Sequence, residues 1–226
     1  MESSRSRLTP LQQDLLRAFF DRERGFFLTG GAALAGFYLG HRETSDLDLF
    51  TLEGESFERG RHVLRAVAGG LGATLEARQR APGFERYAAL RGTETVIVDL
   101  VLERVQQAYP QKTDTNGIRL DPIEEILINK LTTALSRAEE RDLVDLMFLE
   151  RAGLSLESAL PAALAKDGGC TPAALAYVLS QIRIPDGVPL PSGVAPAELR
   201  SYLEDLVKRL RDAAAPPGGK AKSPPA

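Results

Sequence analysis

The chain has 226 residues, enough to bury a sizeable core in one domain or in two small ones. Its formal net charge of −3 provides no overall basic field, so a polyanionic partner would have to meet a local patch. A single cysteine excludes an internal disulfide and a cysteine-based zinc cluster, and two histidines argue against a histidine-rich metal site. The polar first ten residues and the absence of an apolar run of ~20 residues predict a cytoplasmic protein without a membrane segment.

The first half of the chain predicts alternating helices and strands. Thr9 and Pro10 are typical of a helix N-cap and its first turn. The expected elements, in chain order, are a helix (10–24), a strand (26–29), a helix (32–39), a strand (47–52), a helix (56–69) and three strands (72–79, 84–91 and 93–102). Gly92 and Thr93 are expected to form the turn between the last two strands.

The second half is predicted to be helical. Asp121 and Pro122 are typical of another N-cap and first turn, and an apolar stripe at helical spacing follows as far as Leu135. Further helices are expected over residues 139–151, 156–166, 172–181 and 197–213, with a Pro/Gly-rich linker near 185–196 and a disordered tail over 214–226. The expected class is α/β (α+β), a mixed β-sheet flanked by helices and followed by a C-terminal helical bundle. We expect two domains, residues 1–110 and 118–213.

Asp46 and Asp48 are two residues apart on a predicted strand, so their side chains point to the same side. Leu47 and Leu49 take the opposite face and fit the core. Two like charges repel each other, and a divalent cation such as Mg²⁺ would remove that repulsion. The alternative is an exposed strand edge with two solvated acids, which is common for a bare Asp-x-Asp.

Asp99 lies inside the apolar run Val96–Val101, where the sequence otherwise predicts a buried strand. An unpaired buried charge is expensive, so this aspartate requires a cation or strong hydrogen bonds. The alternative is an outward position on a sheet edge. Three carboxylates on adjacent strands are what metal-assisted nucleotidyl transfer requires.

Gly30 and Gly31 stand between a predicted strand and a helix. Without side chains, the backbone there can approach a ligand closely, and the following helix directs N–H groups at an anion. A Gly-Gly pair is also typical of an ordinary turn. The surrounding residues match neither the Rossmann nor the Walker pattern.

These segments carry a family resemblance. Residues 28–34 (LTGGAAL) and 42–50 (RETSDLDLF) are similar to the first motif of the AbiEii/AbiGii toxin family of nucleotidyltransferases. Residues 98–100 resemble its third-carboxylate strand, residues 128–131 with Ala134 and Arg137 its lysine-containing helix, and residues 141–146 its Arg-Asp-x-x-Asp-Leu motif. The resemblance covers about residues 26–150 in the family's order.

The resemblance implies a minimal nucleotidyltransferase fold of the DNA-polymerase-beta-like superfamily that binds a nucleoside triphosphate (NTP) with Mg²⁺ or Mn²⁺. Asp46 and Asp48 would hold the metal, Asp99 would bridge to it or activate the attacking hydroxyl, and Lys130 would complete the catalytic set. The expected nucleotide-binding residues are Gly30, Gly31, Arg42, Ser45, Lys130, Arg137, Arg141 and Asp142. Ala32 stands where the family often has Ser or Thr, which implies lower activity or altered nucleotide preference.

The family also implies a biological role. Its members are toxins of bacterial toxin–antitoxin or phage-defence pairs, and some transfer nucleotides to tRNA ends. We therefore expect an RNA acceptor, such as a tRNA 3′ end, and a cognate antitoxin protein. Three alternatives stay open from the residues: an NTP-binding regulatory module without turnover, a small-molecule nucleotidyltransferase of the antibiotic-modifying kind, and an interaction protein that docks through the last helix.

The basic residues allow more than one interpretation. Lys130, Arg137 and Arg141 would share one face of a continuous helix and could bind a triphosphate, or that face could be solvated. Arg141 could pair with Asp145 along the helix, and Asp142 could orient Lys130 or Arg141. Seven scattered arginines could contact RNA if they converge: Arg59, Arg61, Arg65, Arg78, Arg80, Arg86 and Arg91. His41 and His62 are interpreted as neutral surface residues, and Cys170 as a packing residue or an incidental thiol.

Overall fold

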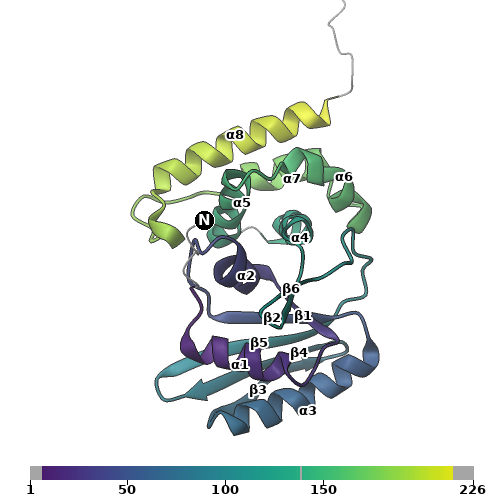
Figure 1. The fold of residues 1–226 in the computed structure, drawn as a ribbon. Coiled ribbons are helices and arrows are strands. Elements are labelled where there is room, and N and C mark those ends of the chain that lie inside the picture. Colours follow the sequence, from purple (N-terminus) through teal and green to yellow (C-terminus); the bar gives the residue numbers. More distant parts are fainter. Residues whose placement is uncertain (1–6, 138, 216–226) are drawn as a thin grey trace, which may run out of the picture.

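The computed structural model describes residues 7–137 and 139–215. A mixed seven-stranded sheet has helices on both of its faces, and further helices form a layer at one side (Figure 1). This architecture confirms the predicted α/β class with a helical second half.

The strands are β1 (Phe26–Thr29), β2 (Asp46–Thr51), β3 (Thr74–Ala81), β4 (Phe84–Arg91), β5 (Glu94–Leu102), β6 (Thr113–Thr115) and β7 (Ile118–Leu120). The α-helices are α1 (Pro10–Phe20), α2 (Gly30–Ala33), α3 (Gly54–Gly70), α4 (Ile123–Ser136), α5 (Glu140–Arg151), α6 (Leu156–Lys166), α7 (Pro172–Ser180) and α8 (Pro196–Ala214). A π-helical turn, η1 (Leu34–Tyr38), continues α2, and a 3₁₀ turn, η2 (Pro191–Gly193), precedes α8.

The strand order is β3-β4-β5-β2-β1-β7-β6. β2 lies parallel to β5 and antiparallel to β1, and β4 pairs antiparallel with β5. In this register Asp48 is opposite Asp99, and Asp99 is opposite Arg86. A single row of charged side chains therefore crosses three neighbouring strands on one face of the sheet.

The predicted N-cap of the first helix is confirmed. The Thr9 hydroxyl accepts the Gln12 backbone N–H, and the Gln12 side chain accepts the Thr9 N–H, which completes a capping box. α1 buries its apolar stripe, and α1 and α3 contact β5 on one face of the sheet. Figure 1 shows α1 and α3 on that side and α2 with the helical layer on the other.

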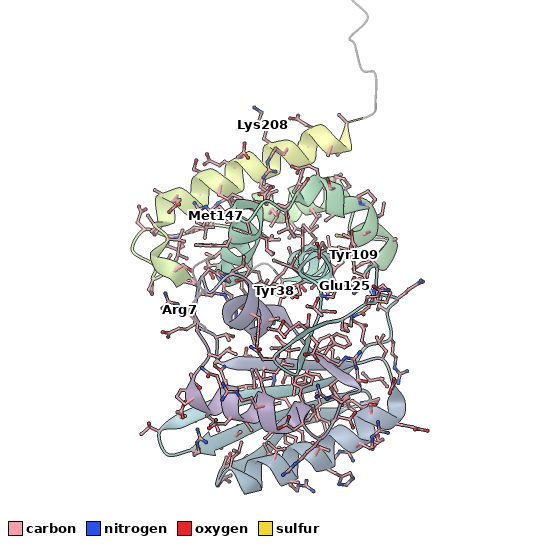
Figure 2. The ribbon with its side chains drawn as sticks, viewed as in Figure 1. Arg7, Tyr38, Tyr109, Glu125, Met147 and Lys208 are labelled. Atoms are coloured by element: carbon pink, nitrogen blue, oxygen red, sulfur yellow. The ribbon has the colours of Figure 1, made fainter. Side chains whose placement is uncertain are left out.

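The helical layer consists of α4 to α8. α4 packs its apolar side, with Ile126, Leu127 and Leu131 fully buried, against α5, α6 and α7. α8 packs along α7 and covers the outer side of the layer. In Figure 2, Lys208 points outward from α8, whereas Met147 lies inside the layer.

Asp121 was predicted to be the N-cap of α4, but this is wrong. Pro122 holds that position, and no side chain caps the helix. Asp121 is instead fully buried, where its carboxylate accepts the Thr29 hydroxyl at 2.7 Å and pairs with Lys112 at 2.6 Å. The Asp121 carboxylate therefore pairs with a cation from another segment, Lys112, instead of capping the helix, because a buried charge needs a counter-charge.

Lys130 and Arg141 do not lie on one continuous helix, which was the condition for their sharing a face. α4 ends at Ser136, and Arg137 is extended with φ −150° and ψ 125°. The three-residue strands β6 and β7 were missed, because so short a strand leaves no periodic signal. The predicted tail, residues 214–226, falls outside the described residues apart from Ala214 and Ala215, the first of which ends α8.

The division into domains at residues 1–110 and 118–213 stays a prediction. β7, which falls in the second of these ranges, pairs with β1 in the sheet. In the described part of the chain, no helix combines the length and hydrophobicity needed to cross a bilayer.

Candidate active site

Asp46 and Asp48 share the face of β2 that looks towards α2 and the helical layer. The strand alternates between partly buried and buried positions, and Leu47 and Leu49 point into the core. The predicted same-side pair is therefore confirmed, since alternation along a strand fixes it. Ser45, expected to contact the nucleotide, donates a hydrogen bond to Asp46 Oδ1 at 2.7 Å.

Asp99 is only 5% exposed, as its apolar surroundings predicted. Its partner is Arg86 of β4, whose Nε and Nη2 donate to Oδ1 and Oδ2 at 2.8 and 2.7 Å. This bidentate pair was not foreseen. The predicted hairpin contained the necessary signal, because a turn at Gly92-Thr93 sets Arg91 opposite Glu94, and counting back along both strands brings Arg86 opposite Asp99.

Asp48 carries uncompensated negative charge. Burial raises its pKa, the neighbouring charges of Asp99 and Asp46 raise it further, and Lys130 and Arg86 offset only part of this, so the pKa of Asp48 is raised to about 6. A carboxylate whose ionised form is this unfavourable gains from a bound cation. The sheet side of the site is therefore acidic and short of positive charge.

Gly30 and Gly31 are needed for internal packing as well as for access. Gly30 has φ +62°, and a Cβ there would collide with Asp48 Oδ2. A Cβ on Gly31 would lie 2.6 Å from an Arg42 guanidinium nitrogen. The two glycines therefore let Asp48 and Arg42 approach the turn closely.

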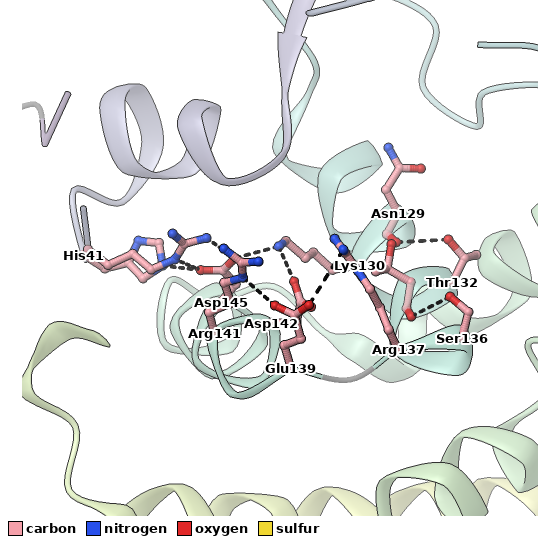
Figure 3. Close-up of polar contacts among 12 residues, drawn as sticks. His41, Asn129, Lys130, Thr132, Ser136, Arg137, Glu139, Arg141, Asp142 and Asp145 are labelled. Atoms are coloured by element: carbon pink, nitrogen blue, oxygen red, sulfur yellow. Dashed lines mark hydrogen bonds and ion pairs between the residues drawn. The ribbon is translucent and has the colours of Figure 1, made fainter. Parts of the chain in front are cut away.

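The opposite wall of the site is a buried ion network (Figure 3). Lys130 Nζ lies 2.7 Å from Asp142 Oδ1 and 2.7 Å from Asp145 Oδ2. Asp145 also accepts Arg42 Nε at 2.6 Å and Nη2 at 2.8 Å, and it lies 2.7 Å from His41 Nε2. Of the two side chains that Asp142 was expected to orient, Lys130 and Arg141, it contacts Lys130.

The charges in this network compensate one another. Burial raises the pKa of Asp145, but hydrogen bonds from Arg42 and His41 and the charge of Lys130 outweigh it and hold the pKa far below its usual range. Burial lowers the pKa of Lys130, but Asp145 and Asp142 outweigh that effect and raise it. Lys130 therefore stays cationic.

His41 and Arg141 were interpreted wrongly. The side chain of His41 is fully buried against Asp145 and the ring of Phe148, not at the surface. Arg141 pairs with Glu139 at 2.7 Å rather than with Asp145, because Asp145 faces inwards to the network. The partners of Asp145 lie more than a hundred residues away in the chain, so no local pattern could have indicated them.

A cleft of about 610 Å³ separates the two walls. Its sheet side includes Thr29, Gly30, Gly31, Asp48 and Phe50, and its helical side includes Asn129, Lys130, Arg137, Asp142 and Lys166. Arg141 is not one of the lining residues within the described chain, whereas Arg137 is and is largely exposed.

Lys166 of α6 is a cleft residue that the sequence did not indicate. Its Nζ lies 2.6 Å from Glu125 Oε1 and 2.6 Å from Asn129 Oδ1. Asp142 Oδ2, also at the cleft, is buried without a hydrogen-bond partner among the described residues. The helical wall thus offers cations together with an acceptor that a ligand's donor or a water would satisfy.

The described ranges, 7–137 and 139–215, contain no group of three or more carboxylate, histidine or cysteine side chains arranged to bind a metal ion. Both oxygens of Asp99 are taken by Arg86, so the third predicted metal ligand is held by an internal cation. Asp46 and Asp48 still present oxygen donors on one face, which is the chemistry that Mg²⁺ or Mn²⁺ prefers.

The arginines that were considered as RNA contacts are mostly engaged within the protein. Besides Arg86, four of them are held in ion pairs with carboxylates: Arg59, Arg61, Arg78 and Arg91.

Comparisons with known proteins bear on the family and on the fold. A family model described as nucleotidyl transferase AbiEii toxin, type IV toxin–antitoxin system, matches residues 14–218. No curated protein matches the chain. Two crystal structures from Helicobacter pylori are similar in fold. A protein proposed to be a nucleotidyltransferase has a TM-score of 0.54 at 19% identity, covering 89% of this chain and 94% of its own. JHP933 has a TM-score of 0.55 at 18% identity, covering 90% and 92%.

Proposed function

The chain belongs to the AbiEii family of nucleotidyltransferase toxins, and on that premise we propose that it transfers a nucleoside monophosphate from an NTP to an RNA 3′-hydroxyl with the help of Mg²⁺ or Mn²⁺. The observation that carries the proposal is the asymmetry of the cleft. One wall ends in Asp48, a carboxylate short of positive charge, and the other holds Lys130 in its cationic form.

A metal-bound triphosphate fits between two such walls. Its phosphate oxygens would meet Lys130, Lys166 and the exposed Arg137 on the helical side. Lys130 would act as a fixed point charge, because its two carboxylate partners hold the ammonium in one place. The backbone at Gly30 and Gly31 lines the same cleft and would lie against the phosphates.

Asp46 and Asp48 would hold the divalent cation, since two carboxylates on one strand face provide oxygen ligands. A bound cation would neutralise the charge that develops on the phosphates. The raised pKa of Asp48 supports this assignment, because burial and the neighbouring carboxylates disfavour its ionised form, which a bound cation would favour.

In the transfer, the acceptor hydroxyl oxygen forms a bond to the α-phosphorus of the NTP. The bond between that phosphorus and the bridging oxygen breaks, and pyrophosphate leaves with the bond's electron pair. The hydroxyl proton passes to a carboxylate or to water, and we assign that role to Asp99, which lies opposite Asp48 in the sheet register. Asp142 and Asp145 would not react; they would hold Lys130 in position.

The acceptor and the antitoxin are proposed from family resemblance. We propose a tRNA 3′ end as the acceptor and growth arrest as the consequence, relieved by a cognate antitoxin. The direct test is incubation with total RNA, Mg²⁺ and each labelled NTP in turn.

We expect label to enter RNA with the wild-type protein and not with the Asp46→Ala/Asp48→Ala double variant. Transfer to RNA-free extracts of small hydroxyl compounds, with none to RNA, would instead favour a small-molecule acceptor. NTP binding without transfer to either would contradict the enzymatic proposal. Growth arrest on expression that survives Asp99→Ala would argue against toxicity by nucleotidyl transfer.

A further inference from the structure

The cleft and the row of charges lie on the same face of the sheet but do not coincide. The cleft is lined by β1, β2, the loop after β5 and the helical wall, and it includes no residue of β4 or β5. The row runs from Asp48 on β2 through Asp99 on β5 to Arg86 on β4. Asp48 is therefore the boundary, with the cleft on one side and Asp99 and Arg86 on the other.

In-line displacement requires the attacking hydroxyl and the leaving pyrophosphate to lie on opposite sides of the α-phosphorus. If the triphosphate occupies the cleft between Gly30 and Lys130, the leaving group lies on the β1 side of Asp48. The attacking hydroxyl must then arrive from the opposite side, over β5 and β4. This step rests on the proposed function, which puts the NTP in the cleft.

The face of β4 and β5 in that direction is open. Four side chains on it are only partly buried, although Ala88 and Asp99 on the same face are buried. The other face packs towards α1 and α3. The partly buried set on the open face is Phe84, Arg86, Ile97 and Val101. The buried set on the opposite face is Glu85, Tyr87, Val98 and Leu100.

Arg86 joins this open face to the reacting centre. Its Nε–H and one Nη2–H go to Asp99, so three of the five guanidinium N–H donors remain for another partner. The side chain is 44% exposed, and its guanidinium carbon lies 5.6 Å from the centre of the Phe84 ring. An aromatic ring and a solvent-facing guanidinium are therefore neighbours at the edge of the site.

We propose that the open face of β4 and β5 is the acceptor subsite, where the single-stranded end of an RNA stacks a base on Phe84 and sets a backbone phosphate against Arg86. Arg86 thereby holds both the acceptor strand and Asp99, the carboxylate that receives the hydroxyl proton. Stacking on an aromatic ring beside a cation is the common means of holding single strands without reading their sequence.

The surface favours a strand over a small acceptor. A sheet face is flat and extended, and the apolar positions continue beyond the ring through Val101 to Phe50, which faces the cleft. A small hydroxyl compound is normally enclosed in a pocket. A base-paired end could not lay an unstacked base on this surface.

The test measures acceptor and NTP binding separately. The probe is a short 5′-labelled single-stranded RNA with a free 3′-hydroxyl, followed by fluorescence anisotropy with the full-length protein. We expect Phe84→Leu and Arg86→Ala each to weaken RNA binding about tenfold. Both should raise KM for the RNA in the transfer assay and leave KM for the NTP unchanged. Phe84→Tyr, which keeps the ring, should bind as the wild type does.

Matched controls lie far from this face. Tyr177→Ala removes an aromatic side chain that is 69% exposed on α7, and Arg65→Ala removes an exposed arginine of α3; neither should change RNA affinity. Unchanged RNA affinity in both Phe84→Leu and Arg86→Ala, with transfer by the wild type intact, would overturn the subsite and leave the proposed function standing. Wild-type transfer to small hydroxyl compounds but not to RNA would overturn both the RNA acceptor and this subsite.

Discussion

Asp48 and Asp145 are carboxylates near the same cleft, and their surroundings shift their pKa values in opposite directions. Asp145 on α5 is surrounded by cations from its own chain, and its pKa is held far below the usual range. Asp48 on β2 faces two other carboxylates, and its pKa is raised to about 6. Burial raises the pKa of both, so the difference comes from their neighbours.

The contrast separates residues that hold the site together from residues that await a ligand. Arg42, His41 and Lys130 converge on Asp145 and tie α4 and α5 to the segment before β2. The charge of Asp48, by comparison, is not balanced by any such set within the described chain. An external cation is what this side of the cleft needs, and loss of each carboxylate should therefore have a different consequence.

The largest expected effect is on catalysis at Asp48. Asp48→Asn should lower nucleotide transfer about 10⁴-fold, or about 5 kcal/mol, because a neutral amide no longer holds the cation that stabilises the transition state. The measurement is initial rate of label transfer at saturating Mg²⁺ and NTP, with Asp212→Asn on the exposed side of α8 as the control. A variant that kept a tenth of the wild-type rate would show that Asp48 is not a metal ligand.

At Asp145 the expected effect is on stability. Asp145→Asn should lower the free energy of unfolding by about 3–5 kcal/mol, because Arg42 would remain buried without its counter-charge and Lys130 would keep only Asp142. Urea denaturation measures the change. Glu198→Gln is the matched control, since it breaks an ion pair with Arg151 that is roughly half exposed, and it should cost much less. Equal losses in the two variants would refute the structural role given to Asp145.

These two aspartates also show what could be predicted from the sequence. The side of Asp48 followed from alternation along one strand, and the burial of Asp99 followed from the apolar residues around it. Local spacing carries such information. The partner of Asp99 was accessible in principle, because the turn at Gly92-Thr93 sets the register of the β4–β5 hairpin.

The ion network around Asp145 could not be predicted from local sequence spacing. The sequence suggested an intrahelical pair with Arg141, but the carboxylate points inwards to His41 and Arg42 from a distant segment. Helical spacing gives neighbours on one helix and says nothing of the element packed against it. For the same reason Lys166, which reaches the cleft from α6, left no sign in the sequence.

A third prediction tests whether Asp48 is held close to the turn by the absence of a side chain. Gly30→Ala should cost about 2–3 kcal/mol, because the new Cβ would add a collision with Asp48 to the cost of a left-handed backbone. Gly92→Ala is the matched control, with φ +60° and open space around it, and should cost only about 1–2 kcal/mol. Thermal unfolding compares them, and only Gly30→Ala should also lower transfer. Equal costs would mean that the contact with Asp48 is not tight.

The smallest expected effect is a pH dependence of stability in the absence of divalent cations. The pKa of Asp48 is about 6 in the folded chain and has its ordinary value of 3.8 when unfolded, so the folded state binds the proton more tightly. Protonation therefore stabilises the folded state below about pH 4, and this contribution is lost as the pH rises through 6. Above pH 6 the ionised carboxylate costs about 1–3 kcal/mol.

Asp48→Asn removes that ionisation. In chelator, the variant should be more stable than the wild type at pH 8 by about 1–3 kcal/mol, and the difference should vanish near pH 4. Saturating Mg²⁺ at pH 8 should stabilise the wild type and leave the variant unchanged, because only the wild type has the charge that the cation relieves. A gain for the variant that is the same at pH 4 and pH 8 would show that packing, and not the charge of Asp48, sets its stability.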